Sequence, residues 1–496
     1  MNLGQAIKGV CTLAVNAPES LELSGCVSDS REVKPGSLYL AMLGENVDGH
    51  IFCAKAMELG AAALVVSKLA HVPAGAPYVL VEDTRRVLSI VANNIYQQPS
   101  EALTLVGITG TNGKTSVTYI AEALLGAAGM TTGVIGTVDY RFAGRNFTMP
   151  HTTPESPIFC RFLREMADSG VGVALTEVSS HALELQRVED LQFALGVFTN
   201  LSQDHLDYHG TLEQYGAAKK RLFTRLLKES RRLQGAIINV DDALGRQLAG
   251  QLTYKVLTYG VASSDADIVA REIESTSQGV RFIAAGPWGD AEVTSRLVGM
   301  HNVLNILAAL GIAELCGADV VAVAGALATL ESIPGRLESV PNPLDIGIWV
   351  DYCHTPDAIS QVLEALRPVV ENRLIVVFGA GGDRDKDKRP LMGAAVEAGA
   401  DLAVVTSDNP RTEDPLDIID GILEGLSGGY KFRQTLVAPD RATAIETAIA
   451  ISQPGDGILV GGKGHETYQL VGSETHHFDD REHAAAAVQR LVGRLS

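Results

Sequence analysis

The sequence predicts an α/β protein of three domains, and two observations lead to this prediction. The chain has 496 residues, which is more than one hydrophobic core normally supports, and at roughly 150 residues per domain this length indicates about three. Short apolar runs alternate with segments of helical periodicity along the chain, which is the pattern of repeated strand–helix–strand units.

Residues 1–98 are predicted to form a small first α/β domain. Its expected strands are LYLAML at 38–43, AALVVS at 62–67 and YVLVED at 78–83, which turn-rich stretches separate. The segment HIFCAKAMELGA between the first two strands has a helical pattern, and QQPSEA at 97–102 is typical of a linker.

Residues 99–333 are predicted to form a doubly wound central domain. The segment opens with LTLVGIT at 103–109, an almost continuous apolar run that is typical of a strand buried on both faces of a parallel sheet. Helix-like and strand-like runs then alternate as far as AAKKRLFTRLL at 217–227. Such an order requires many crossover connections, which parallel strands need.

Residues 334–496 repeat this organisation and are predicted to form the third domain. Four apolar runs end in polar or glycine-rich turns: GIWVDYC, RLIVVFGAGGDRD, ADLAVVTSDNPR and DGILVGGKGHE. Helical patterns lie between them at about 356–371, 388–399, 415–426 and 440–452. Ligands of open α/β sheets bind at the carboxyl ends of the strands, so the polar turns are expected to line a site.

The composition excludes several classes of protein. A net charge of −19 argues against nonspecific binding to nucleic acid or to anionic membranes. The chain contains no run of eighteen apolar residues and no secretory signal at its start, so we expect a cytoplasmic protein without membrane insertion. Six scattered cysteines without C-x-x-C spacing indicate reduced thiols rather than disulfides or a zinc site.

The strongest motif is a phosphate-binding loop. It combines Gly110, Thr111, Asn112, Gly113, Lys114, Thr115 and Ser116 between a predicted strand and a predicted helix. Glycines allow backbone N–H groups to approach phosphate oxygens, the lysine supplies a positive charge, and the Thr115 hydroxyl suits Mg²⁺. The usual pattern has a further glycine where this chain has Ile108, so the loop is a shortened variant. It predicts binding of ATP or GTP.

Polar residues at two further strand ends are candidates for metal binding or catalysis. Glu177 ends an apolar run and is a natural ligand for Mg²⁺ or for orienting water. Asn200, Asp204, His205 and His209 follow the next run. By pattern alone, Lys219 and Lys220 would lie on a solvated helix face.

The order of these motifs resembles the Mur ligase family, and within it the members that add a diamino acid. The resemblance covers essentially the whole chain and rests on GTNGKT, EVSSHAL, NLSQDHLDYHG, YGAAK, HNVLNILAA, PGRLE, VDYCHTPDA, FGAGGDRDKDKRP, DNPR and GKGHE. It implies an acid–amino-acid ligase of peptidoglycan synthesis that converts ATP to ADP and phosphate. It also implies a uridine-nucleotide domain, a central P-loop ATPase-like domain and a C-terminal Rossmann-like domain.

The resemblance implies roles for residues around ATP and the metal. Lys114, Lys219 and His205 would be catalytic, and Mg²⁺ would bind at Thr115, Glu177, His205 and Lys219. Lys219 would be carbamylated by CO₂, which converts its amine into a carboxylate-like anion. Asn302, Arg336 and Asp351 would contact the nucleotide, and Cys353 replaces the alanine usual in the family, which implies a packing change.

The resemblance also implies the other two substrates. UDP-MurNAc-L-Ala-D-Glu would contact Ser28, Ser30, Glu45, Asn46, Val47, His151, Thr152, Thr153, Ser180 and Arg187. Some relatives have asparagine at the position of His151 and glutamine at that of Leu185, which leaves these two contacts open. Meso-diaminopimelate would contact Arg389, Asp408, Asn409, Pro410, Arg411, Gly462 and Glu466.

The choice of amino acid depends on Arg411. Diaminopimelate carries a second carboxylate, which an arginine can bind through two parallel hydrogen bonds and which lysine lacks. Relatives that add lysine lack this arginine, so an L-lysine-adding ligase is the alternative. A binding module that hydrolyses ATP without forming an amide is the alternative outside this class. We expect the protein to act as a monomer.

Overall fold

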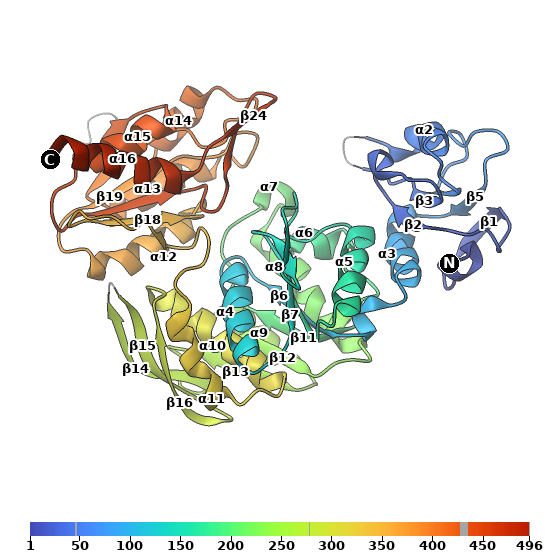
Figure 1. Cartoon of the computed structure of the whole chain (residues 1–496), viewed down its shortest axis with the longest axis horizontal. Coiled ribbons are helices and arrows are strands. Elements are labelled where there is room, and N and C mark those ends of the chain that lie inside the picture. The colour runs from blue at the N-terminus through green and yellow to red at the C-terminus, as the bar shows by residue number, and fades with distance from the viewer. Residues whose placement is uncertain (45–46, 277, 427–434, 496) are drawn as a thin grey trace.

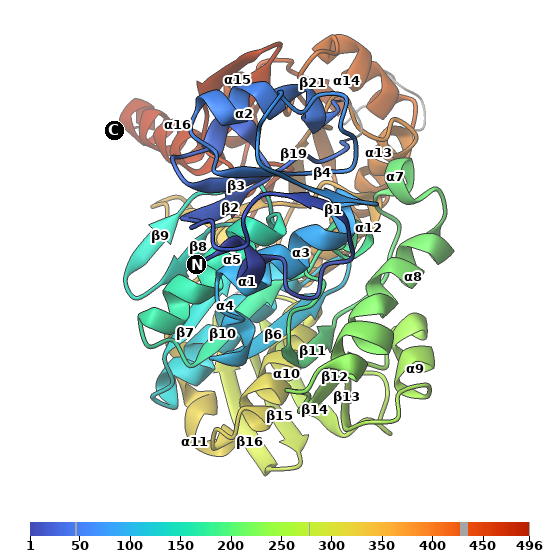
Figure 2. The same ribbon diagram turned by 90° about the vertical axis from the view of Figure 1, so that its right-hand side faces the viewer.

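The computed structural model describes residues 1–44, 47–276, 278–426 and 435–495, and these residues form three large β-sheets covered by helices and one two-stranded sheet (Figure 1). The N-terminal and C-terminal sheets lie over opposite ends of the central domain, and Figure 2 shows the N-terminal sheet in front of the C-terminal domain. The predicted α/β class with a doubly wound centre is confirmed. The boundaries at 98/99 and 333/334 stay predictions.

The N-terminal sheet has five strands in the order β1-β5-β4-β3-β2, with only β1 antiparallel to its neighbour. The strands are β1 (Thr12–Asn16), β2 (Gly25–Val27), β3 (Ser37–Leu40), β4 (Ala63–Val66) and β5 (Tyr78–Val81). The helices are α1 (Leu3–Ala6), α2 (Cys53–Glu58) and α3 (Thr84–Ile95), with 3₁₀ turns at Ser30–Glu32, Gly49–Phe52 and Pro99–Glu101.

The central sheet has eleven strands in the order β16-β15-β14-β13-β12-β11-β6-β10-β7-β8-β9. Its parallel part contains β6 (Thr104–Thr109), β7 (Thr132–Ile135), β10 (Val173–Glu177), β11 (Phe193–Phe198), β12 (Gly235–Asn239), β13 (Val256–Gly260) and β14 (Ile268–Thr276). Antiparallel strands extend both edges: β8 (Tyr140–Phe142), β9 (Arg145–Phe147), β15 (Gly279–Gly286) and β16 (Gly289–Ser295).

Helices cover both faces of the central sheet, because successive residues of its parallel strands are apolar and point to opposite sides. Leu105 belongs to one apolar cluster, whereas its neighbour Val106 belongs to the cluster under α4 and α10. The helices are α4 (Lys114–Ala127), α5 (Ser156–Asp168), α6 (Ser180–Glu184), α7 (Leu206–His209), α8 (Leu212–Arg221), α9 (Ala243–Ala249), α10 (Met300–Leu315) and α11 (Val320–Val323). A π-helical turn, Leu222–Leu227, follows α8, and a 3₁₀ helix, Ala324–Thr329, follows α11.

The first apolar cluster continues from the central domain into the N-terminal domain. It contains Leu38 and Val91 of the N-terminal domain together with Phe159 and Phe193 of the central domain, all of them fully buried. The predicted linker at 97–102 is therefore short and ordered, and it holds two domains that share one core.

The C-terminal sheet has six strands in the order β17-β18-β22-β19-β20-β21, all parallel except the edge strand β17. The strands are β17 (Glu338–Ser339), β18 (Gly347–Asp351), β19 (Leu374–Phe378), β20 (Leu402–Val405), β21 (Thr435–Val437) and β22 (Gly457–Gly461). The helices are α12 (Pro356–Leu366), α13 (Lys388–Gly399), α14 (Pro415–Leu423), α15 (Arg441–Ala450) and α16 (Asp480–Leu495), with a 3₁₀ turn at Arg367–Val369. A separate hairpin joins β23 (Tyr468–Val471) and β24 (Glu474–His477).

A fully buried arginine connects two strand ends of the C-terminal sheet. Arg441 donates two hydrogen bonds of 2.7 Å to the Asp480 carboxylate, which starts α16. The same guanidinium donates to the carbonyl oxygens of Ser407, after β20, and Gly461, at the end of β22. The Arg441–Asp480 pair thus fixes the starting points of the DNPR and GKGHE loops.

Replacing Arg441 should destabilise the protein strongly. Arg441→Met leaves the Asp480 carboxylate buried and unpaired, so the free energy of unfolding should fall by about 3–5 kcal/mol. Urea unfolding followed by circular dichroism measures this change. Arg490→Met is the matched control, since Arg490 pairs with Glu446 on the surface and its loss should change the stability by less than about 1 kcal/mol. Equal losses in both variants would contradict the role of Arg441.

Candidate active site

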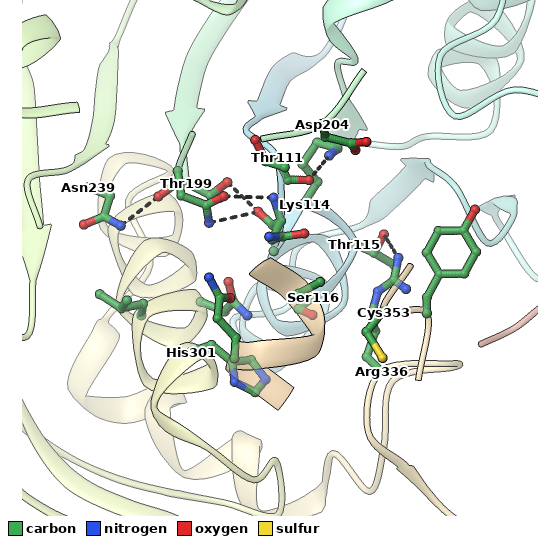
Figure 3. A pocket seen from close by; sticks show the side chains of 18 of the residues that line it. Thr111, Lys114, Thr115, Ser116, Thr199, Asp204, Asn239, His301, Arg336 and Cys353 are labelled. Atoms are coloured by element: carbon green, nitrogen blue, oxygen red, sulfur yellow. Dashed lines mark hydrogen bonds between the residues drawn. The ribbon is translucent and has the colours of Figure 1, made fainter. Parts of the chain in front are cut away.

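A cavity of about 780 Å³ lies where the carboxyl ends of the central strands face the C-terminal domain. Residues after β6, β10, β11 and β12 form one wall, and α8, α10 and residues 336–365 contribute to the others. In Figure 3, Lys114, Thr199 and Asp204 come from the central sheet, whereas Arg336 and Cys353 approach from the C-terminal side. The predicted edge of polar strand ends is thus one wall of the cavity.

The phosphate loop adopts a conformation that requires glycine. Gly113 precedes α4 with a φ of 85°, a left-handed conformation that side chains disfavour. A Cβ atom at Gly113 would lie 2.4 Å from Oδ1 of Asn305 on α10. The loop therefore packs directly against α10, and its backbone N–H groups at the start of α4 face the cavity, as anion binding requires.

Two lysines converge on one carbonyl oxygen of the loop. Nζ of Lys114 lies 2.8 Å from the Gly110 oxygen, and Nζ of Lys219 lies 2.9 Å from the same atom. Within the described residues, neither lysine donates a hydrogen bond to a carboxylate. Burial lowers the pKa of both ammonium groups, and the charge of Lys114 lowers that of Lys219 further. This arrangement attracts an anion.

The position of Lys219 differs from the one that its sequence pattern predicts. Lys219 is 1% exposed and its ammonium lies over the Tyr215 ring, whereas Lys220 reaches the surface residue Gln247. The helical periodicity did not reveal this because α8 is mostly polar, and only the family resemblance distinguished Lys219 from Lys220.

The Glu177 carboxylate is held at the end of β10 by three hydrogen bonds. Oε1 accepts from the Thr115 hydroxyl at 2.9 Å and from the Thr137 backbone N–H, and Oε2 accepts from the Thr137 hydroxyl. Arg336 of the C-terminal side donates to the same Thr115 oxygen at 3.2 Å (Figure 3). Thr115 is therefore the point at which the loop, a carboxylate and the C-terminal domain meet.

This donor set fits Mg²⁺ in its chemistry. A hydroxyl and a carboxylate side by side are typical of Mg²⁺ sites that obtain their remaining ligands from water and phosphate oxygens. Thr115 and Glu177 have these groups at 2.9 Å from each other. Among the residues that the structure describes, no three His, Cys, Asp or Glu side chains form a preassembled metal site.

The histidine-rich loop after β11 also lies at the cavity, but its side chains differ in placement. Asn200, Asp204 and His205 line the cavity. His209 instead lies 3.0 Å from the Ser180 hydroxyl and packs in a ring cluster with His181 and Tyr215. Desolvation by the surrounding cavity lowers the pKa of His205 to about 4, so its imidazole is uncharged at neutral pH, although 44% of the side chain is exposed.

The residues predicted to contact the nucleotide from α10 and from the C-terminal domain differ in their placement. Arg336 and Asp351 line the cavity, and Asp351 also accepts a hydrogen bond from the Leu337 backbone N–H. Asn302 does not line it, because its side chain is buried and donates to the Val298 carbonyl oxygen. Asn305, three residues later on α10, takes the place beside Gly113. Cys353 is buried and packs against Gly461.

Several cavity residues were not predicted from the sequence. Thr199 is not among the predicted site residues. Its hydroxyl donates a hydrogen bond of 2.6 Å to the Asn112 carbonyl oxygen and so helps to fix the conformation of the phosphate loop. Further examples are Asn239, Asp241, Asp242, Tyr259, His301, Tyr352 and His354. The signal for the first three was available, since they directly follow the apolar run of β12.

The predicted muramoyl-peptide residues occupy one side of the cavity and its approach. Thr152 and Ser180 line the cavity, and the Thr152 hydroxyl lies 3.0 Å from that of Thr137. Thr153 is buried and donates to the Glu177 carbonyl oxygen, while Arg187 donates to the Thr153 carbonyl oxygen. His151 is exposed and Leu185 caps α6.

Arg187 is connected to the N-terminal domain through an acidic residue. Its guanidinium lies 3.0 Å from Glu155, which also pairs with Arg85 of α3 at 2.6 Å. The predicted uridine residues Ser28, Ser30 and Val47 lie farther away in that domain and do not line the cavity. Glu45 and Asn46 lie outside the described residues.

The predicted amino-acid residues form a second cluster at the ends of β19, β20 and β22. Asn409 donates to Glu466 at 2.8 Å, and Asp408 lies against Gly462. Pro410 follows Asn409, and Arg411 has a φ of 53° and donates to the Gly382 carbonyl oxygen at 2.7 Å. Arg389 is buried and already pairs with Glu413 at 2.9 Å, so it holds the loop rather than facing open space.

The second cluster adjoins the cavity through aromatic side chains. The ring of His465, next to Glu466, lies 5.2 Å from that of Tyr352, which lines the cavity. The Arg336 guanidinium also lies over the Tyr352 ring, 4.8 Å from the ring centre. A group held at Glu466 is thus separated from the phosphate loop by only a few side chains.

The fold and site define a three-domain α/β protein whose glycine-rich loop lines a cavity between its central and C-terminal domains. The family models match in three segments: "Mur ligase family, catalytic domain" at residues 22–97, "Mur ligase middle domain" at 108–313 and "Mur ligase, glutamate ligase domain" at 335–464. The chain belongs to the Mur ligase family.

Curated relatives match over nearly the full length. The UDP-N-acetylmuramoyl-L-alanyl-D-glutamate--2,6-diaminopimelate ligase of Geobacter metallireducens is 41% identical over 490 residues, which cover 96% of each chain. The protein of the same name from Synechocystis is 44% identical over 475 residues, covering 94% of this chain and 92% of that one.

Solved structures agree with this fold. A structure of the ligase with the same name covers 99% of both chains at 32% identity, with a TM-score of 0.68. The MurF ligase of Thermotoga maritima in complex with ADP has a TM-score of 0.64 at 19% identity and covers 95% of this chain and 98% of that one, which shows a shared fold alone. Among the described residues, no helix has the length and apolar character needed to cross a bilayer.

Replacing Lys114 should weaken nucleotide binding without unfolding the chain. Lys114→Met removes the ammonium at the cavity, so the Kd for ATP should rise about tenfold or more. The melting temperature should change little, because the substitution also relieves the repulsion between Lys114 and Lys219. Titration calorimetry with ATP and Mg²⁺ measures this. Lys55→Met, which removes an exposed lysine on α2, is the control. An unchanged Kd for ATP in the Lys114 variant would contradict the proposed phosphate site.

Proposed function

We propose that this chain joins meso-2,6-diaminopimelate to the terminal carboxylate of UDP-MurNAc-L-Ala-D-Glu, with conversion of ATP to ADP and phosphate, in peptidoglycan synthesis. The relatives that match over more than nine tenths of the chain are named for this ligase activity. The observation that carries the proposal is the convergence of Lys114 and Lys219 on the Gly110 carbonyl, next to Thr115 and Glu177.

A carboxylate does not react with an amine until it is activated. In the proposed reaction, the substrate carboxylate attacks the γ-phosphorus of ATP and ADP leaves, which gives an acyl phosphate. The amine of diaminopimelate then adds to the acyl carbon, the tetrahedral intermediate expels phosphate, and the nitrogen loses a proton to give the amide. Negative charge accumulates at the transferred phosphoryl group, so charge neutralisation is the main catalytic requirement.

The residues at the cavity are suited to this requirement. Lys114 and Arg336 bring positive charge to the phosphate loop from two domains. Thr115 and Glu177 would hold Mg²⁺, which would neutralise phosphate charge when bound. Thr152, Thr153, Ser180 and Arg187 would bind the muramoyl peptide with its carboxylate toward Thr137, and Ser28, Ser30, Glu45, Asn46 and Val47 would bind the uridine end.

We propose further that Lys219 is carbamylated. Its burial beside Lys114 lowers the pKa of its ammonium well below the ordinary value, which favours the neutral amine that adds to CO₂. The resulting carbamate would place a negative charge between Lys114 and the uncharged imidazole of His205, where a second Mg²⁺ would bind. The carbamate would also remove the repulsion between two ammonium groups that share one carbonyl oxygen.

Lys219 should be essential through its carbamate rather than its ammonium. Lys219→Ala should abolish amide formation, and formate or acetate should restore part of it by supplying a carboxylate in the vacated space. Product formation measured by chromatography, together with intact-protein mass spectrometry for one added CO₂, tests this. Lys220→Ala, which alters an exposed neighbour, should retain activity. Full activity of Lys219→Ala without added carboxylate would remove the carbamate from the proposal.

Arg411 should determine the choice of amino acid. Arg411→Ala removes the guanidinium that would pair with the distal carboxylate, so the KM for diaminopimelate should rise by an amount equivalent to about 2–5 kcal/mol while the KM for ATP is unchanged. Arg384→Ala, which removes an exposed arginine nearby, is the control. Steady-state assays with diaminopimelate and L-lysine test this, and equal turnover of the two by the unaltered chain would favour the lysine-adding alternative.

A further inference from the structure

Lys463 is a lysine without any exposed surface, and the proposed reaction gives it no role so far. It follows β22 in the GKGHE loop and is 0% exposed. Its Nζ lies 3.0 Å from Oδ1 of Asn409 and 3.3 Å from Oε2 of Glu466, and 5.5 Å from the centre of the Tyr468 ring. Burying an ammonium is costly unless charged and polar partners surround it, so these contacts require an explanation.

Asn409 and Lys463 hold the same oxygen of Glu466. Nδ2 of Asn409 donates to Oε2 at 2.8 Å, and Nζ of Lys463 approaches this atom from the other loop. Oδ1 of Asn409 also accepts from the Leu470 backbone N–H at 3.0 Å, which connects the group to β23. Contacts from the DNPR loop, from the GKGHE loop and, through Asn409, from β23 therefore fix the position of Glu466.

The charges around Glu466 leave one carboxylate without a cation. Asp480 is paired with Arg441 and Glu466 with Lys463, whereas Asp408 forms no ion pair among the described residues. Burial raises the pKa of Glu466, and the nearby charge of Asp408 raises it further, whereas Lys463 lowers it. The other titratable or charged groups that face Glu466 are Tyr352, Tyr468 and Arg441. A primary ammonium of a ligand would complete the charge balance.

We propose that Lys463 is a positioning residue of the amino-acid site, which holds the Glu466 carboxylate in place and in its charged form for the ammonium group of the incoming amino acid. This inference rests on the proposed function and adds that binding of the amino acid requires the buried ammonium of Lys463. Without Lys463, the charge of Asp408, which raises the pKa of Glu466, is no longer offset, and Glu466 takes up a proton at higher pH. A protonated Glu466 no longer attracts an ammonium group.

The direction of the pH effect follows from this charge state. Glu466 binds the ammonium only when it is ionised, so amino-acid binding weakens as the pH falls through the pKa of this carboxyl. Removal of Lys463 removes an interaction that lowers this pKa. The acidic limb of the pH profile for diaminopimelate should therefore move to higher pH in a variant that lacks Lys463.

The test compares Lys463→Met, Lys463→Arg and Glu466→Gln with the unaltered chain, using diaminopimelate, ATP and UDP-MurNAc-L-Ala-D-Glu. Lys463→Met should raise the KM for diaminopimelate about tenfold or more, leave the KM for ATP within about twofold, and move the acidic limb of kcat/KM to higher pH. Lys463→Arg should retain the limb of the unaltered chain, since it keeps the charge. Adding Lys463→Met to Glu466→Gln should raise the KM for diaminopimelate by less than about twofold, because the two residues act as one unit.

The matched control is Arg490→Met, which removes an exposed cation of the same domain and should change none of these quantities. A Lys463→Met protein with an unshifted pH profile, or with parallel increases in the KM values for ATP and diaminopimelate, would overturn the inference in favour of a purely structural role. If Lys463→Met does not fold, Lys463→Gln replaces it, and the same profile decides. Absence of any amide product from the unaltered chain would instead refute the proposed function.

Discussion

The arrangement of the active site depends on two ammonium groups that share the carbonyl oxygen of Gly110. Two ammonium groups that lie 2.8 and 2.9 Å from the same oxygen atom repel each other, and burial makes this repulsion stronger. The protein offers Lys114 and Lys219 no carboxylate hydrogen bond within the described residues, so the pair is stable only together with an anion or after one lysine loses its charge. The phosphate loop, the placement of α8 and the approach of Arg336 all serve this concentration of positive charge in a chain whose net charge is −19.

The second cluster follows the opposite electrostatic principle. Asp408 and Glu466 concentrate negative charge after β20 and β22, and the buried cations Arg441 and Lys463 lie beside them. Arg441 fixes the backbone of the two loops, while Lys463 contacts the side chains. The regions that we propose to bind phosphate and an ammonium group thus lie on either side of the contact between Tyr352 and His465, as an anionic electrophile and a cationic precursor of the nucleophile require.

The sequence predicted the parallel strands β6, β7, β10 and β11 and polar residues at their ends because both depend on local patterns, whereas it did not identify β12, β13 and β14. Apolar runs such as 103–109 have no other stable placement than the interior of a sheet, and the residues that follow them must lie at its edge. The antiparallel strands β8, β9, β15 and β16 were not predicted, since β8 and β9 are only three residues long and β15 and β16 alternate buried with exposed residues instead of forming a continuous apolar run. The placements of Asn305 rather than Asn302, and of Lys219 in the interior, depend on how α10 and α8 are rotated about their axes, which only packing against the loop determines.

The shared core of the N-terminal and central domains makes the two interdomain junctions unequal. Separating the first pair would expose residues such as Leu38 and Phe159 to water, at a cost that grows with the apolar area exposed. The C-terminal domain has its own cores and meets the central domain through polar contacts, among them Asn112 with Asp357 and Arg336 with Thr115. Water can replace those hydrogen bonds, so rotation of the C-terminal domain costs less free energy than separation of the N-terminal domain from the central domain. A nucleotide that contacts both the central and the C-terminal domain would favour the arrangement in which these domains are close together. By linkage, the factor by which the nucleotide favours this arrangement equals the factor by which this arrangement increases the affinity for the nucleotide.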